Sequence, residues 1–267
     1  MEQRELFTII TGASKGLGKC LAIECAKRGR NLILIALPFE NVNRTAMDLS
    51  KKFNIKAIGY ETDLTSNKNV DSMAKWIKLN YQIDMLINNA GVGGTNYIEA
   101  ATENDISTII QLNMRALVFL THQLLPVLKT QKKSYVLNIS SLAAFGPMAY
   151  KTVYPASKAF VSSFSRGLNA ELKDTNISVS VAHPGGMATN PEIKERMGKY
   201  NSFIKSTFLS PGETAKICIE QMLSEKTVIV PGFANKISRL GFKLFPERLR
   251  LNILGRSVKK EIIVKAA

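Results

Sequence analysis

Two residues four positions apart in a helical pattern, Tyr154 and Lys158, carry the chemistry that the sequence indicates most directly. Side chains at this spacing lie on one face of a helix, so the phenol and the ammonium would point the same way. A phenol has a pKa of about 10 and is a poor acid at neutral pH unless a neighbouring cation favours its anion. We therefore expect this pair to exchange a proton with an alcohol or carbonyl oxygen. Taken alone, a Tyr and a Lys at this spacing more often belong to a solvated helix face.

A glycine-rich turn near the N-terminus supplies the second chemical feature. Gly12, Gly16 and Gly18 lie between the apolar residues 6–10, which predict a buried strand, and a helical pattern that extends to about residue 28. Glycines let the backbone approach a pyrophosphate closely, and the free N–H groups at the start of a helix face its charge. A glycine-rich turn without a ligand is the alternative. Because a strand precedes the turn and a helix follows it, we expect a dinucleotide site.

The end of the second predicted strand, residues 31–36, should decide which dinucleotide is used. Sites for NAD usually place an acid there for the ribose 2′-hydroxyl, and sites for NADP place a base near the 2′-phosphate. Ala36, Leu37 and Pro38 offer neither group, whereas Lys15 supplies a cation in the glycine-rich turn. The missing acid and the nearby cation favour NADP(H), and NAD(H) stays open.

Strand and helix patterns alternate along the rest of the chain, which is typical of a parallel sheet covered by helices. We expect further strands at residues 56–61, 85–87, 135–139, 177–182 and 227–230, and helices at about 42–53, 66–79, 104–129, 154–173 and 211–224. No internal repeat or linker interrupts them. The patterns therefore predict an α/β fold in which one domain contains a doubly wound parallel sheet.

Several candidate site residues fall where predicted strands end, and open parallel sheets bind their ligands at that edge. Asp63 and Leu64 follow the third strand, where the adenine of a dinucleotide would lie. Asn89, Ala90 and Gly91 follow the fourth strand and would line the cofactor channel. Because an Asn side chain both donates and accepts hydrogen bonds, it can equally tie this loop to neighbouring strands.

Four further polar residues have less common surroundings. Ser140 and Ser141 follow the fifth strand, and Asn113 lies within a helical pattern, where a polar side chain needs a reason. His183 opens the loop after the sixth strand. A His beside a Pro-Gly pair at a strand end is more often hydrogen-bonded for structure than used as an acid or base, so we expect a structural role for it.

The composition is that of an ordinary globular protein, with 45% hydrophobic and 21% charged residues among 267. No apolar run approaches the roughly 20 residues that span a bilayer, and we expect no secretory signal because charged residues lead directly into the first predicted strand. Three cysteines without zinc-like spacing fit a reducing compartment such as the cytoplasm and predict no metal site.

The net charge is +15, and its basic residues are unevenly distributed. Many of them lie in a basic C-terminal extension, residues 232–267. The mixture of bases and apolar residues there suits a helix that lies on an anionic membrane surface. It equally suits an apolar wall of the substrate pocket with solvated bases outside. Nucleic acid is not expected, because no recognisable binding module accompanies the charge. Residues 186–210 predict a partly helical substrate lid, and residues 1–185 the cofactor and catalytic part.

Together these motifs resemble the short-chain dehydrogenase/reductase family over about residues 6–230. They occur in the family's order: Thr-Gly-x3-Gly-x-Gly at 11–18, Asn-Asn-Ala-Gly at 88–91, a lone helical Asn, a Ser, Tyr-x3-Lys, and Pro-Gly-x3-Thr at 184–189. Ser141 is preferred to Ser140 because it stands thirteen residues before Tyr154, the family's usual separation. The chain beyond residue 230 is more loosely similar to ketoacyl and steroid reductases.

The resemblance implies a seven-stranded parallel Rossmann sheet and a set of catalytic roles. Ser141 would hold the substrate oxygen while Tyr154 gives it a proton. Lys158 would bind the nicotinamide ribose and lower the pKa of Tyr154, and Asn113 would hold a water on a proton path. The implied cofactor contacts are Gly12, Ser14, Lys15, Gly16, Leu17, Gly18, Asp63, Leu64, Asn89, Ala90, Gly91, Tyr154, Lys158, Pro184, Gly185 and Thr189.

The resemblance predicts an NADP(H)-dependent oxidoreductase that reduces a small apolar carbonyl compound, such as a ketoacyl chain, to an alcohol. One departure is Leu37, since NADP-preferring members often have Arg just after the second strand. A homodimer or homotetramer is implied through the helices that contain Asn113 and Tyr154. The alternative is a non-catalytic nucleotide sensor on the same fold; such proteins typically lose the Tyr or the Lys, and both are present.

Overall fold

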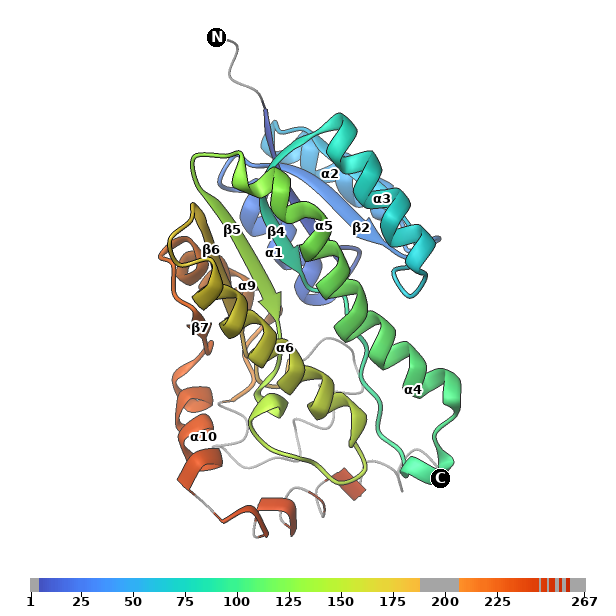
Figure 1. The fold of residues 1–267 in the computed structure, drawn as a ribbon, viewed down its shortest axis with the longest axis vertical. Helices are drawn as coiled ribbons and strands as arrows, with labels where there is room; N and C mark the ends of the chain where they lie inside the picture. The colour runs from blue at the N-terminus through green and yellow to red at the C-terminus, as the bar shows by residue number, and fades with distance from the viewer. Residues whose placement is uncertain are drawn as a thin grey trace.

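The computed structural model describes residues 5–187 and 207–244, together with 246–248, 250–252, 255 and 258–259. Seven strands form one parallel sheet in the order β3-β2-β1-β4-β5-β6-β7 (Figure 1). The strands are β1 (Leu6–Thr11), β2 (Asn31–Ala36), β3 (Ala57–Glu61), β4 (Gln82–Asn88), β5 (Ser134–Ile139), β6 (Ile177–Ala182) and β7 (Val228–Ile229). The predicted doubly wound parallel sheet is confirmed.

The described helices include those that cover both faces of this sheet. They are α1 (Gly16–Ala26), α2 (Val42–Phe53), α3 (Asn67–Asn80), α4 (Glu103–Ile110), α5 (Leu117–Lys129), α6 (Val153–Glu171), α9 (Pro211–Leu223) and α10 (Phe233–Leu244). Three short turns of helix join them: η1 (Ile98–Ala100), η2 (Gln111–Ala116) and η3 (Leu142–Phe145). One core packs α1, α2 and α9 on the sheet, and the other packs α3, α5 and α6 on the opposite face.

The strands are mostly apolar because their side chains alternate between these two cores. Ile9 of β1 belongs to the core with α3 and α5, and the next residue, Ile10, belongs to the core with α1 and α9. Leu86 and Ile87 of β4 divide in the same way. Each such side chain contributes about 1.5–3 kcal/mol by its burial. A sheet buried on both faces therefore reads as continuous apolar runs rather than as an alternating pattern.

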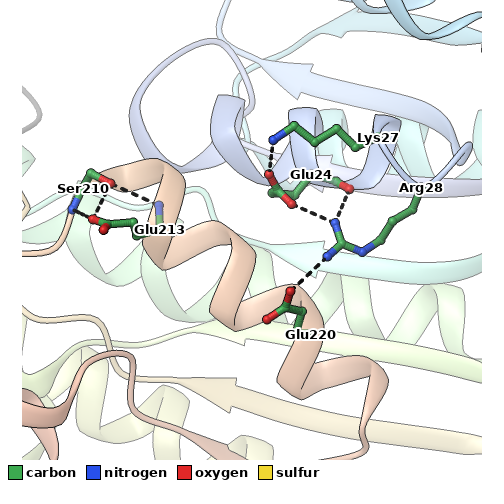
Figure 2. A network of polar contacts seen from close by, with 6 residues as sticks. All are labelled: Glu24, Lys27, Arg28, Ser210, Glu213 and Glu220. Atoms are coloured by element: carbon green, nitrogen blue, oxygen red, sulfur yellow. Dashed lines mark hydrogen bonds and ion pairs between the residues drawn. The ribbon is translucent and has the colours of Figure 1, made fainter.

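A polar network on the rim connects α1, the helix that follows the glycine-rich turn, with α9 (Figure 2). Ser210 caps α9: its hydroxyl accepts a hydrogen bond from the Glu213 N–H, and the Glu213 carboxylate accepts one from the Ser210 N–H, both at 3.1 Å. Arg28 donates to Glu24 at 2.8 Å and lies 3.7 Å from Glu220 of α9. Of these contacts, the Arg28–Glu220 ion pair joins the end of α1 to α9, and the Ser210–Glu213 bonds close the N-terminus of α9 itself.

A fully buried hydrogen-bond network ties the sheet to the helices beneath the carboxyl edge. The Asn88 side chain donates to the Asn138 side chain at 2.8 Å and to the Thr121 hydroxyl at 3.0 Å. The Asn138 side chain in turn donates to the Ser165 hydroxyl at 2.9 Å. Because an unpaired amide in this interior would be costly, the network holds α5 and α6 in one register on β4 and β5.

The helix predicted over residues 104–129 is interrupted by a π-helical turn, η2, between α4 and α5. Such a turn places one extra residue per hydrogen-bonded loop and often occurs at functional sites. The hydrophobic pattern did not indicate it. Pro126 lies inside α5, which continues to Lys129.

The structure describes two of the predicted C-terminal features, the lid and the basic extension, only in part. The predicted lid, residues 186–210, is described only at 186–187 and 207–210. Within the basic extension, α10 lies beyond β7 and packs on η3 (Figure 1). No helix in the described ranges has both the length and the apolar character needed to cross a bilayer.

Candidate active site

A cavity of about 740 Å³ lies at the carboxyl edge of the sheet. Fifteen of the predicted site residues line it: Gly12, Ser14, Lys15, Leu17, Gly18, Asp63, Leu64, Asn89, Ala90, Gly91, Ser141, Tyr154, Lys158, Pro184 and Gly185. Gly16 and Asn113 lie behind this lining, and Thr189 lies outside the described residues. The structure thus brings the glycine-rich turn and the Tyr–Lys pair to one cavity.

The glycine-rich turn forms a cradle that leaves no space for side chains. A Cβ on Gly18 would lie 2.0 Å from the Gly12 carbonyl oxygen, and Gly12 itself has φ of +65°. The Asn89 side chain donates to the carbonyl oxygens of Thr11 and Gly12 at 2.9 and 3.1 Å, so Asn89 ties the loop after β4 to the turn. At Lys15, no side chain caps the N-terminus of α1. These backbone donors at the cavity fit a pyrophosphate.

Tyr154 and Lys158 occupy the first turns of α6, where Lys158 is buried and Tyr154 is half-buried. The Lys158 ammonium donates to the Ile139 carbonyl oxygen at 3.0 Å and lies 5.8 Å from the centre of the Tyr154 ring. Burial lowers the pKa of Lys158 to about 8. It also raises the pKa of Tyr154, which a hydrogen bond with the Ser141 side chain lowers in part.

The shift of Tyr154 is opposite to the lowering that the sequence led us to expect from Lys158. Removal of the phenol from water disfavours its anion, and this effect outweighs the other contributions. The Lys158 ammonium is directed at the end of β5, where it bonds to the Ile139 carbonyl. Since an ammonium has three donors, those not bonded to Ile139 remain for a ligand in the cavity.

Asn113 lies in the π-helical turn η2 and holds the loop that covers the cavity. Its side-chain oxygen accepts from the Val92 N–H, and its side-chain nitrogen donates to the Val92 carbonyl, both at 2.9 Å. The same nitrogen donates to the Ser157 hydroxyl of α6 at 3.0 Å. A Cβ on Gly91 would lie 3.0 Å from the Asn113 side-chain oxygen and 3.2 Å from the Lys158 ammonium. Glycine at this position therefore permits the close packing of the loop.

His183 is buried outside the cavity lining and supports the backbone of Ser141. One ring nitrogen lies 3.1 Å from the Ser141 carbonyl oxygen, and the other lies 3.4 Å from the Ser162 hydroxyl. The ring also packs on Phe145 with 4.5 Å between the ring centres. Burial lowers the pKa of His183 to about 4, so the ring is neutral at physiological pH. These contacts agree with the structural role expected for it.

An acid that the sequence reading missed, Glu40, lines the cavity beside Leu37. Its carboxylate accepts a hydrogen bond from the Ser14 hydroxyl at 2.7 Å and one from the Lys15 ammonium at 2.6 Å. The bond from Lys15, followed by that from Ser14, lowers the pKa of Glu40. The inference that no acid lies near the end of β2 is therefore wrong. The chain turns back after Leu37, with φ of +67° at Phe39, and this brings the carboxylate to the glycine-rich turn.

A metal centre finds no support in the described ranges, where no group of three or more His, Cys, Asp or Glu side chains is placed to hold an ion. The sequence that forms this site matches a family model. Residues 7–199 match the model of the short chain dehydrogenases. The chain belongs to the short chain dehydrogenase family. It is accordingly an NAD(P)-dependent oxidoreductase.

Three known members of the short chain dehydrogenase family illustrate the likeness. The NADP-dependent 3-hydroxy acid dehydrogenase of Schizosaccharomyces pombe is 28% identical over 83% of this chain and 88% of its own. The very-long-chain 3-oxoacyl-CoA reductase of Mus musculus is 31% identical over 84% of this chain and 75% of its own. A short-chain dehydrogenase from Sphingobium yanoikuyae, solved in complex with NADPH, is 26% identical over 88% of this chain and 92% of its own, with a TM-score of 0.77.

The neutral state of buried His183 predicts a pH-dependent stability. Its pKa is depressed in the folded state, so the unfolded chain binds more protons and stability falls as the pH drops from about 6.5 toward 4. Between pH 7 and pH 5 this residue should account for a loss of about 2 kcal/mol in the free energy of unfolding. Urea unfolding at both pH values measures the loss, and His183→Gln should remove it.

The other histidine of the chain, exposed His122, provides the matched control. The free energy of unfolding of His122→Gln should fall between pH 7 and pH 5 by as much as that of the wild type. Any contribution of the carboxylates is common to the two proteins. If His183→Gln and the wild type lost the same stability between pH 7 and pH 5, burial of a neutral His183 would not be the cause.

Proposed function

We propose that this protein reduces the carbonyl group of an apolar oxo compound, of the 3-oxoacyl type, with NADPH as the hydride donor. The observation that carries the proposal is one cavity lined by Ser141, Tyr154 and Lys158 at one end and by the glycine-rich turn at the other. The substrate class draws support from relatives that are named a 3-hydroxy acid dehydrogenase and a 3-oxoacyl-CoA reductase.

The proton step follows from the side chains at the end of β5 and the start of α6. A bound nicotinamide would supply the hydride, and the protein supplies position and protons. The Ser141 hydroxyl holds the substrate oxygen beside the Tyr154 hydroxyl. Tyr154 keeps its proton at neutral pH because its pKa is raised, and it donates that proton to the oxygen as negative charge develops there. Lys158 has donors left for the ribose hydroxyls, and Asn113 positions the loop above them.

NADP(H) is the proposed cofactor because Ser14 and Lys15 offer a hydroxyl and a cation for a 2′-phosphate. Relatives whose names or descriptions include NADP or NADPH support this choice. NAD(H) remains the second candidate. In this proposal the chain acts as one Rossmann-type domain: residues 1–185 bind the cofactor and catalyse, residues 186–210 form a lid over the substrate, and residues 232–267 form the extension.

An amphipathic helix in that extension supports peripheral contact with an anionic membrane. Phe233, Ile237, Leu240 and Leu244 of α10 are exposed, and their spacing places them on one face of the helix. The opposite face packs on η3, where the Arg239 guanidinium lies 5.0 Å from the centre of the Phe145 ring. An exposed apolar stripe beside the bases of this segment has the composition of an interfacial helix. An apolar substrate would then enter from the lipid side, near η3 and Ser141.

Members of this family generally act on small molecules and form oligomers. For this chain we propose a homodimer or homotetramer formed through α5 and α6. Phe119 of α5 and Phe160 of α6 are large apolar side chains that remain about two-fifths exposed. Ile110, at the end of α4, is a further exposed apolar side chain. Burial of such residues is the usual source of affinity between subunits.

Tyr154→Phe removes only the hydroxyl and tests the catalytic proposal. The rate of NADPH oxidation with 3-oxoacyl substrates should fall by about 10²–10⁴-fold, the usual contribution of a positioned acid. Tyr135→Phe, at the amino end of β5, makes the same chemical change away from the cavity and should retain full activity. Near-complete activity of Tyr154→Phe would refute the proton-donor role. A wild type that oxidised neither NADPH nor NADH with any of these substrates would refute the proposed reduction.

Flotation with vesicles tests the proposed membrane contact. The full chain should float with vesicles that contain phosphatidylserine at low salt, and less so at high salt or with neutral phosphatidylcholine, because charge contributes to binding. Leu240→Glu should reduce flotation severalfold. Met47→Glu changes an apolar residue on α2 that is at least as exposed, and it should leave flotation intact. Absence of flotation with anionic vesicles at low salt would dismiss the contact.

Light scattering after size exclusion tests the proposed subunit contact. The wild type at micromolar concentration should have the mass of a dimer or tetramer, and Phe119→Glu should lower that mass by placing a charge in the interface. Leu79→Glu on α3, which also replaces an exposed apolar residue, should not. A monomeric wild type would contradict the proposal.

A further inference from the structure

The Glu40 carboxylate accepts hydrogen bonds from the two side chains that are proposed to bind a 2′-phosphate. Ser14 and Lys15 donate to its two oxygens at 2.7 and 2.6 Å, and all three residues line the cavity. Hydrogen bonds between an ammonium and a carboxylate are among the stronger ones. A phosphate that uses the same donors has to displace the carboxylate from them.

The backbone on both sides of Glu40 is ordered by a local turn and by the start of α2. The Glu40 N–H donates to the Leu37 carbonyl oxygen at 3.3 Å. Asn41, with φ of +57°, leads directly into α2, whose first residue, Val42, is fully buried. Rotation of the Glu40 side chain would release Ser14 and Lys15. Because the neighbouring Phe39 is 95% exposed, the rim of the cavity is open to water and permits that rotation.

The charge of Glu40 acts in opposite directions on the two dinucleotides. A carboxylate accepts a hydrogen bond from a ribose 2′-hydroxyl, as acids do in sites for NAD. It repels a 2′-phosphate, and it neutralises the cation that would attract one. Its side chain is 24% exposed and that of Lys15 is 81% exposed, so water screens both effects and the discrimination stays graded.

We propose that Glu40 is a specificity-determining residue that weakens the preference for NADP(H) and allows the same site to accept NAD(H). This inference rests on the proposed function, since it concerns the cofactor of that reaction. It assigns the acid for the ribose to the loop before α2, four residues beyond the end of β2, in place of an acid at the strand end.

Binding of two small nucleotides tests the inference without catalysis. The probes 2′,5′-ADP and 5′-AMP differ by the 2′-phosphate, and calorimetric titration gives their dissociation constants for the wild type and for Glu40→Gln. The variant should bind 2′,5′-ADP roughly threefold to tenfold more tightly, the size expected for partly exposed charges. Its affinity for 5′-AMP should stay within about twofold or decrease. The gain should shrink at high salt.

Three further variants separate charge from structure. Glu61→Gln removes an exposed acid from the end of β3, outside the cavity lining, and should leave the ratio of the two affinities unchanged. Glu40→Asp keeps the charge and should keep most of the wild-type ratio. In the Lys15→Gln background the gain from Glu40→Gln should be smaller, because the cation that Glu40 neutralises is absent and only the direct repulsion of the 2′-phosphate is relieved.

The outcomes distinguish this inference from the proposed function. An unchanged ratio in Glu40→Gln, with both probes still bound, would overturn the role of Glu40 alone. Equal weakening of both probes would show that Glu40 only supports the loop, and would also overturn it. If the folded wild type bound neither probe, the dinucleotide site would be refuted, and both the inference and the proposed function with it.

Discussion

The buried ammonium of Lys158 is the constraint around which the catalytic end of the cavity is arranged. A cation removed from water is costly unless it is paired, and this one lies against the Ile139 carbonyl at the end of β5. The backbone of Lys158 is also fixed, since the Lys158 carbonyl oxygen accepts a hydrogen bond from the Ser140 hydroxyl at 2.7 Å. The absent side chain at Gly91 leaves room for the ammonium. The end of β5 therefore positions Lys158 through its side chain and its backbone together.

The carboxyl end of β5 also positions the hydroxyl groups of Ser141 and Tyr154, and this arrangement depends on the parallel order of the strands. β5 delivers Ser141 directly, and the buried contacts of Asn138 hold α6, with Tyr154 in its first turn, against β4 and β5. His183, at the end of the neighbouring β6, reaches the Ser141 carbonyl from the far side. Parallel strands bring all their carboxyl ends to one edge, so groups more than forty residues apart meet without a long loop.

The sequence predicted the sheet and most of the cavity lining because both depend on local patterns. Apolar runs identified strands such as residues 31–36, and the spacing of the glycines and of Tyr154 and Lys158 identified the lining. Three features were not accessible in this way. The π-helical turn at Asn113 has no hydrophobic signature, the direction of the Tyr154 pKa depends on burial by distant segments, and Glu40 reaches the cavity through a turn with positive φ. The available signal was the position of Glu40 directly before Asn41, the residue that precedes the predicted helix at 42–53.

Burial shifts the pKa values of Tyr154 and Lys158 in opposite directions, and this sets the protonation state of the pair. It disfavours the charged form of each, so the phenol holds its proton more tightly while the ammonium holds its own less tightly. A phenol that retains its proton is prepared to act as an acid toward a developing alkoxide, whereas as a base it would first have to lose that proton. With a pKa of about 8, Lys158 stays largely charged at neutral pH and can bind hydroxyl groups. The protonation state of the pair at neutral pH, a protonated phenol beside a charged ammonium, is therefore the one that the proposed proton donation by Tyr154 requires.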